Sequence, residues 1–112
     1  MTDRDSTITA LADPTRRGIV DLLSQRAYRA GELADTFDMS APAMSRHLRI
    51  LRTRGLIEDE RSEEDARLRL FHLRREPFTK LSQWLADVES FWDEQLDSFK
   101  SHVARKQKRK KQ

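Results

Sequence analysis

Four arginines fall within nine residues near the middle of the chain, in the stretch SAPAMSRHLRILRTRG of residues 40–55. These are Arg46, Arg49, Arg52 and Arg54, and no Asp or Glu occurs between Asp38 and Glu58. Guanidinium groups with no carboxylate beside them suit a polyanion, and DNA is the usual one. The plainer interpretation is a solvated amphipathic helix with an arginine-rich outer face, which is what most charge runs are.

Helical periodicity gives this stretch two faces. At about 100° per residue, one side carries an apolar stripe and the other a polar arc. The stripe is Met44, Leu48 and Leu51, and the arc is Pro42, Ser45, Arg46, Arg49 and Thr53. Ser40 is a natural N-cap, and Gly55 is suited to a left-handed helix end. The segment 30–37 predicts a shorter helix before it, so the pair is typical of a helix-turn-helix.

The N-terminal part of the second helix is the part that such proteins direct at base edges. Ala43 is small enough for close approach, for example to a thymine methyl group. His47 borders the buried stripe, so it either orients the helix, touches a phosphate, or is a packed histidine without a DNA role. The candidate DNA contacts on this helix are Ser40, Ala41, Ala43, Ser45, Arg46, His47 and Arg49.

A β-hairpin is predicted directly after this helix. A strand-like run begins at residues 55–61, and residues 67–73 alternate polar and apolar side chains around a polar tip at 62–66. Arg61, Arg67 and Arg69 lie on this hairpin, where they are candidates for contacts to DNA phosphates. The alternative is that cross-strand pairs with Glu58, Glu60 or Glu63 consume their charges.

The remaining segments predict three further helices. One covers about residues 5–12, and the next begins at Pro14 with Asp13 as its cap. The last covers about 77–103 and has apolar residues at steps of three and four. These elements predict a mainly α protein with a small β-hairpin, in the order α-α-α-α-β-β-α, as one domain over 1–103. A basic tail, 104–112, is expected to be disordered and to attract DNA without sequence preference.

Three pieces of the sequence resemble the ArsR/SmtB family of winged helix-turn-helix repressors. They are LADPTRR at 11–17 with the helix after it, ELA at 32–34, and MS at 39–40 through SRHL at 45–48 to GLI at 55–57. With the hairpin, the resemblance covers roughly residues 7–73. It implies a homodimer that binds an operator in double-stranded DNA and represses transcription, often of its own operon.

The chain departs from the family where many members sense metals. Their cysteines lie in the segment where this chain has Ala34 and Thr36, and the whole sequence contains no cysteine. A thiolate site for soft ions is therefore excluded. His47, His72 and His102 are isolated, and the acids from Asp87 to Asp97 lack the spacing of a calcium loop. We expect no metal and no cofactor; a regulator that responds to a small ligand, or to a metal held without cysteine, is the alternative.

The apolar side of the last helix is too wide and too aromatic for one small domain to cover, which favours a dimer. The alternative is that this stripe closes the core of its own chain. The resemblance also places the first and last helices at the dimer interface. The expected interface residues are Ile8, Leu11, Trp84, Val88, Phe91, Trp92 and Phe99.

Composition weighs against other classes of protein. The net charge of +3 depends on the tail: six of the 22 basic residues lie in 105–111, so sixteen bases accompany nineteen acids before it. Only three glycines occur, and Ser45 and His47 diverge by about 200° on a helix, so neither a phosphate loop nor a catalytic pair is predicted. We expect a cytoplasmic DNA-binding protein that is neither an enzyme nor membrane-bound. A winged helix that binds protein or RNA is the remaining alternative.

Overall fold

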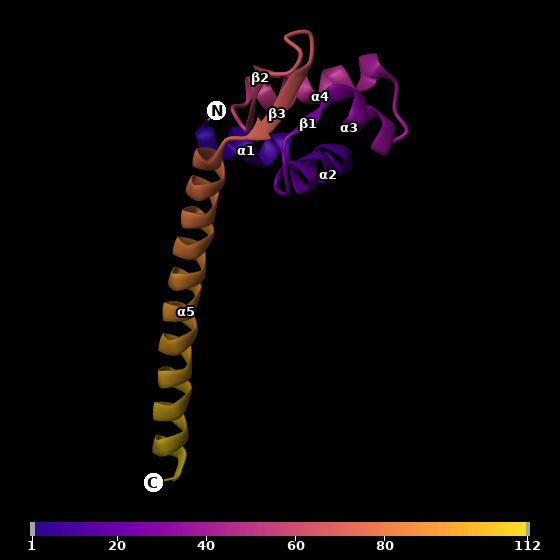
Figure 1. Ribbon diagram of the computed structural model, residues 1–112. Coiled ribbons are helices and arrows are strands. Elements are labelled where there is room, and N and C mark those ends of the chain that lie inside the picture. The colour runs from indigo at the N-terminus through magenta and orange to yellow at the C-terminus, as the bar shows by residue number, and fades with distance from the viewer. Residues whose placement is uncertain (1, 112) are drawn as a thin grey trace. The chain divides into compact units, whose positions relative to one another are not determined.

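The computed structural model describes residues 2–111, and the side chains of residues 2–107. The chain divides into two compact units, Met1–Lys80 and Leu81–Gln112. The elements follow the order α1-α2-β1-α3-α4-β2-β3-α5 (Figure 1). The architecture is the predicted winged helix-turn-helix, with one short strand that the sequence did not predict.

Four helices belong to the first unit: α1 (Asp3–Ala10), α2 (Pro14–Leu23), α3 (Ala30–Thr36) and α4 (Ala41–Thr53). The predicted caps are confirmed, since Asp13 accepts a hydrogen bond from the Arg16 N–H at 3.1 Å and Ser40 accepts one from Ala43 at 3.2 Å. The first helix starts earlier than expected because the Thr2 hydroxyl caps it. Gly55 has a φ of 81°, the left-handed conformation predicted for the end of α4.

The sheet has three antiparallel strands in the order β1-β3-β2. β2 (Ile57–Arg61) and β3 (Arg69–Leu73) form the predicted hairpin, with Arg61 opposite Arg69 and Ile57 opposite Leu73. β1 (Tyr28–Arg29) pairs with the outer edge of β3. The expected second strand began at residue 67, but β3 begins two residues later, so Arg67 lies in the loop and not on a strand face.

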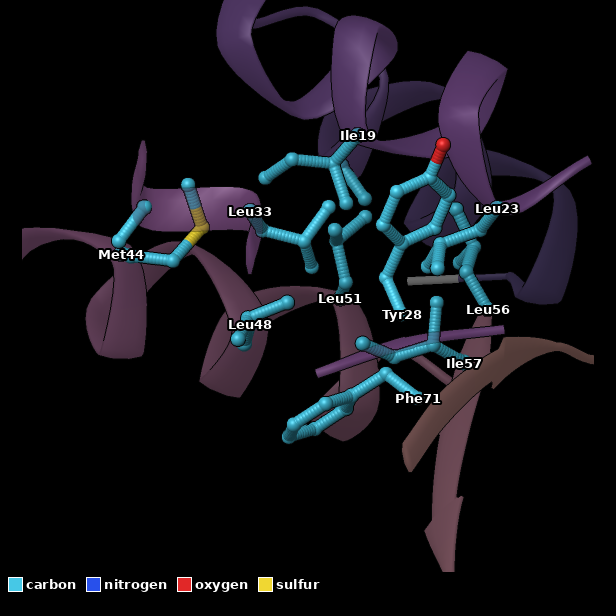
Figure 2. Packing of buried hydrophobic residues seen from close by; sticks show 12 residues of the cluster. Ile19, Leu23, Tyr28, Leu33, Met44, Leu48, Leu51, Leu56, Ile57 and Phe71 are labelled. Atoms are coloured by element: carbon cyan, nitrogen blue, oxygen red, sulfur yellow. The ribbon is translucent and has the colours of Figure 1, made fainter. Parts of the chain in front are cut away.

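The core of the first unit lies where the four helices meet the hairpin (Figure 2). Met44, Leu48 and Leu51 are buried, which confirms the predicted inner face of α4. Ile57 and Phe71 bring the strands into the same cluster, together with Ile19 and Leu33 from α2 and α3. This packing fixes the inner face of α4 and leaves its opposite arc exposed.

The last helix, α5 (Arg75–Lys111), is longer at both ends than predicted. Pro77 falls within the first turn, where backbone N–H groups have no partner in the helix, so the helix can begin before it. Beyond Val103 the helix continues through residues 104–111, where Ala, Arg, Lys and Gln favour a helix and cations suit its C-terminal end. Gln112 lies outside the described residues, and a domain boundary after residue 103 stays a prediction.

Candidate nucleic-acid interface

The exposed arc of α4 presents the predicted polar side chains. Ser45, Arg46 and Arg49 are all exposed, as are Ser40 and Ala41 at the start of the helix. Among the residues whose side chains the structure describes, neither Arg46 nor Arg49 has a salt-bridge partner. Two guanidinium groups are thus available on the outward side of a helix whose other side is anchored in the core.

The turn between α3 and α4 is held by backbone geometry. Asp38 has a φ of 50°, and the Met39 N–H donates to the Ala34 carbonyl at 2.9 Å. Behind the turn, the Phe37 ring lies over Gly18 of α2, so that a Cβ at residue 18 would be 2.8 Å from the ring. Gly18 therefore permits the close approach that supports the helix-turn-helix, a role that spacing in the sequence did not indicate.

His47 lies on the inner flank of α4. Its ring is half-buried, and its Nδ1 is buried without a hydrogen bond to any described residue. The pKa of Asp13 is lowered first by the hydrogen bond from the Arg16 N–H, with a smaller contribution from the charge of His47. His47 thus lies near the cap of α2, and its contact with DNA stays a prediction.

On the hairpin, two of the three predicted arginines are paired with acids. Arg67 Nε lies 3.2 Å from Asp65 Oδ1, and this guanidinium lowers the pKa of the Asp65 carboxyl. Arg69 Nη1 lies 3.1 Å from Asp59 Oδ2. Cross-strand pairing was the predicted alternative, but the partner is Asp59 and not Glu58, Glu60 or Glu63.

Asp59 also contacts α4. Its Oδ1 accepts from Arg52 Nη1 at 3.4 Å, so one carboxylate joins the helix to the hairpin. The Asp59 side chain is only 16% exposed, whereas Arg52 and Arg69 are about half exposed. This bridge was not predictable from the sequence, because it joins residues of three elements, α4, β2 and β3.

A basic cleft of about 420 Å³ runs between α4 and the hairpin. Ser45 and Arg49 line it from α4, and Arg67 and Arg69 line it from the hairpin. Arg29 also lines it, although it was not among the predicted contacts. The sequence feature that could have indicated Arg29 is its position three residues before Glu32, at the start of α3. The Arg29 backbone N–H donates to Glu32 at 3.0 Å and lowers the pKa of that carboxyl.

Not every predicted contact reaches the cleft. Arg46 and Ser40 lie on the exposed arc outside its lining, and Arg61 lines a separate hollow with Glu60 and Glu63. The cleft and the arc together form one face of the first unit, which we call the basic face. It is made of Arg29, Ser45, Arg46, Arg49, Arg52, Arg67 and Arg69. Such a face can hold a phosphate backbone between helix and hairpin while α4 meets base edges.

Within the described part of the chain, no three His, Asp or Glu side chains are grouped so that they could hold a metal ion. A thiolate site does not fit, since the sequence has no cysteine. None of the helices in residues 2–111 is both long and apolar enough to cross a membrane.

The residues expected at a dimer interface are mostly exposed. Ile8 on α1 and Val88, Phe91, Trp92 and Phe99 on α5 are exposed apolar side chains. Leu11 is half-buried against the core of the first unit, and Trp84 is half-exposed. Phe78 of the first unit packs against that unit's core, and Val88, Phe91, Trp92 and Phe99 stay predicted interface residues.

This arrangement is similar to that of known bacterial regulators. The family model "Bacterial regulatory protein, arsR family" matches residues 13–59. The transcriptional repressor SdpR of Bacillus subtilis is 46% identical over 52 residues, which are 46% of this chain and 58% of SdpR. The HTH-type transcriptional regulator Rv2034 of Mycobacterium tuberculosis is 37% identical over 90 residues, 80% of this chain and 78% of that protein. A crystal structure of an ArsR family transcriptional regulator has a TM-score of 0.74 and 34% identity, covering 82% of this chain and 98% of that one.

Proposed function

The chain belongs to the arsR family of bacterial regulatory proteins, and from this we propose that it is a homodimeric repressor that binds an inverted-repeat operator in double-stranded DNA. Family membership makes it a transcriptional regulator. SdpR is named a transcriptional repressor, which supports repression as the direction of control here. Binding to DNA in a bacterium would take place in the cytoplasm.

The observation that carries the proposal is the exposed arc of α4. Arg46 and Arg49 project from a helix whose register is fixed by Met44, Leu48 and Leu51 in the core. An arginine held in this way can form two hydrogen bonds to a guanine edge in the major groove, and each such pair discriminates by about 1–3 kcal/mol. Ser45 adds a hydroxyl beside Arg49, and Ala43, about 60° around the helix from Arg46, adds a small apolar contact.

The cleft beside α4 supplies the second part of the proposal. Arg67 and Arg69 border it, and we assign them to phosphate contacts that position the protein without reading sequence. Arg61 would act in the same way from the opposite strand. Beyond the cleft, the basic residues from Arg105 onward would add salt-sensitive attraction to any duplex.

The dimer follows from the exposed apolar side chains of α5. Phe91, Trp92 and Phe99 are each more than 60% exposed, and aromatic residues of this size are typical of interface centres. A two-fold dimer would set two copies of α4 about 34 Å apart, one turn of DNA, which gives the operator its inverted repeat.

We also propose that DNA binding is independent of metals and oxidants. Soft ions require sulfur ligands, and thiol oxidation requires cysteine, which this chain lacks. Titration of the DNA complex with zinc, cadmium, arsenite or a chelator should leave the affinity unchanged. Release of DNA by one equivalent of zinc would show instead that a site without cysteine controls binding.

The test of function is selection of bound duplexes from a random library, followed by titration of the selected operator. Arg46→Ala should cost about 1–3 kcal/mol of affinity and relax the base preference at one position in each half-site. Arg75→Ala is the matched control, because Arg75 is an exposed arginine at the start of α5, outside the basic face. Unchanged sequence preference in Arg46→Ala would remove this residue from base recognition, and failure to select any sequence would refute operator binding.

A further inference from the structure

A hollow of about 470 Å³ lies where the end of α2, the end of β3 and the start of α5 meet. All of its lining residues belong to the first unit. Its apolar lining includes Leu23, which is buried, and Leu73 and Phe78, which pack against the core. Basic side chains line the same hollow beside them. We call it the junction pocket, and the residues that set its chemistry are Leu23, Arg26, His72, Leu73, Arg75 and Phe78.

The charge of the junction pocket is positive. None of the described residues that line it is an Asp or Glu. Two of its basic side chains contact residues outside the lining: His72 Nε2 lies 3.1 Å from Glu58, and Arg74 Nη1 donates to the Gly55 carbonyl at 3.2 Å. Arg75 is exposed and has no salt-bridge partner among the described side chains. Its guanidinium is therefore available to an anionic ligand in the pocket.

Another cation of the pocket, Arg26, is held in a fixed position by its neighbours. Its guanidinium carbon lies 3.6 Å from the centroid of the Tyr28 ring, and its Nη1 donates to the Ala27 carbonyl at 2.9 Å. Its Nη2 donates to Glu32 Oε2 at 3.2 Å. An arginine has more N–H donors than these contacts use. Because this guanidinium is already fixed, it would lose little side-chain entropy on binding a further acceptor.

We infer that the junction pocket binds an organic carboxylate with an apolar body, and that this ligand weakens operator binding. The carboxylate would contact Arg26 and Arg75, and the apolar body would cover Leu73 and Phe78. An inorganic anion would leave the apolar lining in water, and a neutral hydrocarbon would bury the guanidinium groups without a new partner. A volume of about 470 Å³ is usual for a small-molecule site. The effect on the operator rests on the proposed function, whereas binding of the ligand does not.

Glu32 connects the junction pocket to the basic face. Its Oε2 lies 3.2 Å from Arg26 Nη2, and its Oε1 lies 3.3 Å from Arg29 Nε. Arg26 and Arg29 thus share one carboxylate, and Arg29 lines the basic cleft beside α4. A ligand carboxylate at Arg26 would weaken the ion pair between Arg26 and Glu32. Glu32 would then hold Arg29 more strongly, so this arginine would be less available to a DNA phosphate.

The expected change in operator affinity is modest, because the side chains that transmit it are partly exposed. Arg26 and Arg29 are about half exposed and Glu32 is 29% exposed. An ion pair of this kind changes an equilibrium constant by about 1.4- to 5-fold. The proposed dimer contains two such pairs, so a saturating ligand should weaken operator binding by roughly 2- to 25-fold.

Calorimetric titration of the full-length protein without DNA tests the binding of the ligand. Octanoate should bind, whereas acetate, octanol and inorganic phosphate, which each lack the charge or the apolar body, should bind about tenfold or more weakly. Arg75→Ala should lower the affinity for octanoate by about tenfold, because a hydrogen bond between charged groups is lost. Arg4→Ala is the matched control, since Arg4 is an exposed arginine on α1 outside the lining. Equal octanoate affinity in the wild type and Arg75→Ala, or equal affinity for octanoate and octanol, would overturn the inference.

Anisotropy titration of the selected operator, with and without octanoate, tests the control of DNA binding. Octanoate should weaken operator binding by the wild type. Glu32→Gln should bind octanoate at least as tightly but lose this response, because its side chain cannot pass a change of charge from Arg26 to Arg29. An equal response in Glu32→Gln, or octanoate binding that leaves operator affinity unchanged, would overturn the regulatory part. If no operator is selected, the proposed function fails while the calorimetric result stands. If octanoate does not bind, the junction pocket inference fails while operator binding stands.

Discussion

Replacing Asp59 should lower the stability of the first unit and at the same time raise its affinity for DNA. Its carboxylate holds Arg52 at 3.4 Å and Arg69 at 3.1 Å, so both guanidinium groups are partly neutralised on the basic face. Asp59→Asn keeps the size of the side chain and removes its charge. We expect this variant to be less stable than the wild type and to bind unselected duplex DNA more tightly.

The structure sets the size of both effects. Ion pairs with half-exposed partners are each worth about 0.2–1 kcal/mol, so losing two should cost about 0.5–2 kcal/mol in the free energy of unfolding. For a domain of this size, each kcal/mol corresponds to roughly 4–8 °C in Tm. Each arginine that becomes available to a phosphate should steepen the dependence of log Kobs on log salt by about 0.9, hence by about 1–2 for Arg52 and Arg69 together.

Thermal melts at one protein concentration and fluorescence anisotropy over a salt series measure the two effects. Asp21→Asn is the matched control, because it makes the same chemical change at an exposed position on α2. An Asp59→Asn protein with the salt slope of Asp21→Asn would refute the idea that Asp59 restrains the two arginines. A folded variant that binds DNA more weakly would show that Asp59 orients them for contact.

Three further predictions concern the same unit. Arg67→Ala should weaken binding to all duplexes alike and lower the salt slope by about one; a wild-type slope would mean that Asp65 retains this guanidinium in the complex. Gly18→Ala should destabilise the protein by about 1–3 kcal/mol in chemical denaturation, because its Cβ would be 2.8 Å from the Phe37 ring, and Phe37→Leu in that background should recover part of the loss. Glu32→Gln should remove a part of the stability that depends on pH. The hydrogen bond from the Arg29 N–H lowers the pKa of Glu32 from 4.5. The contribution of this carboxylate to the free energy of unfolding is therefore present above pH 4.5 and is lost as the pH falls through the lowered pKa. Wild-type and Glu32→Gln melts that converge at low pH would support this, and parallel curves would contradict it.

Local signals were enough to predict most of the first unit. The caps Asp13 and Ser40, the glycine at 55 and the stripe of Met44, Leu48 and Leu51 each depend on residues close in sequence, and each is found as predicted. The exposed arc of α4 followed from the same periodicity. Errors occurred at helix ends, where Arg75 and Lys111 extend α5 beyond the signals given by Pro77 and Val103.

Features that join distant residues were not predictable from one sequence. The two-residue strand β1 is defined by its pairing with β3, from Tyr28 to Phe71, and its own residues carry no periodic pattern. The bridge from Arg52 through Asp59 to Arg69 requires the relative placement of α4 and both strands. The requirement for glycine at position 18 was likewise not predictable, since it arises only from the close approach of the Phe37 ring.

The pairing of charges on the basic face bears on how specificity would arise. Arg29, Arg52, Arg67 and Arg69 each contact an acid, whereas Arg46 and Arg49 have no such partner among the described side chains. In the proposed complex, an arginine that is paired with an acid must exchange a carboxylate for a phosphate. Its net contribution to the binding free energy is therefore small and independent of the DNA sequence. Arg46 and Arg49 of α4 would lose no ion pair within the protein on binding. Their contribution to the binding free energy would depend on the base that they contact. Before residue 105 the chain carries more acids than bases, which further limits its attraction to unselected DNA. In the proposed complex the acids beside the basic face would thus raise the ratio of specific to non-specific binding, and Asp59→Asn should lower that ratio even where it increases total affinity.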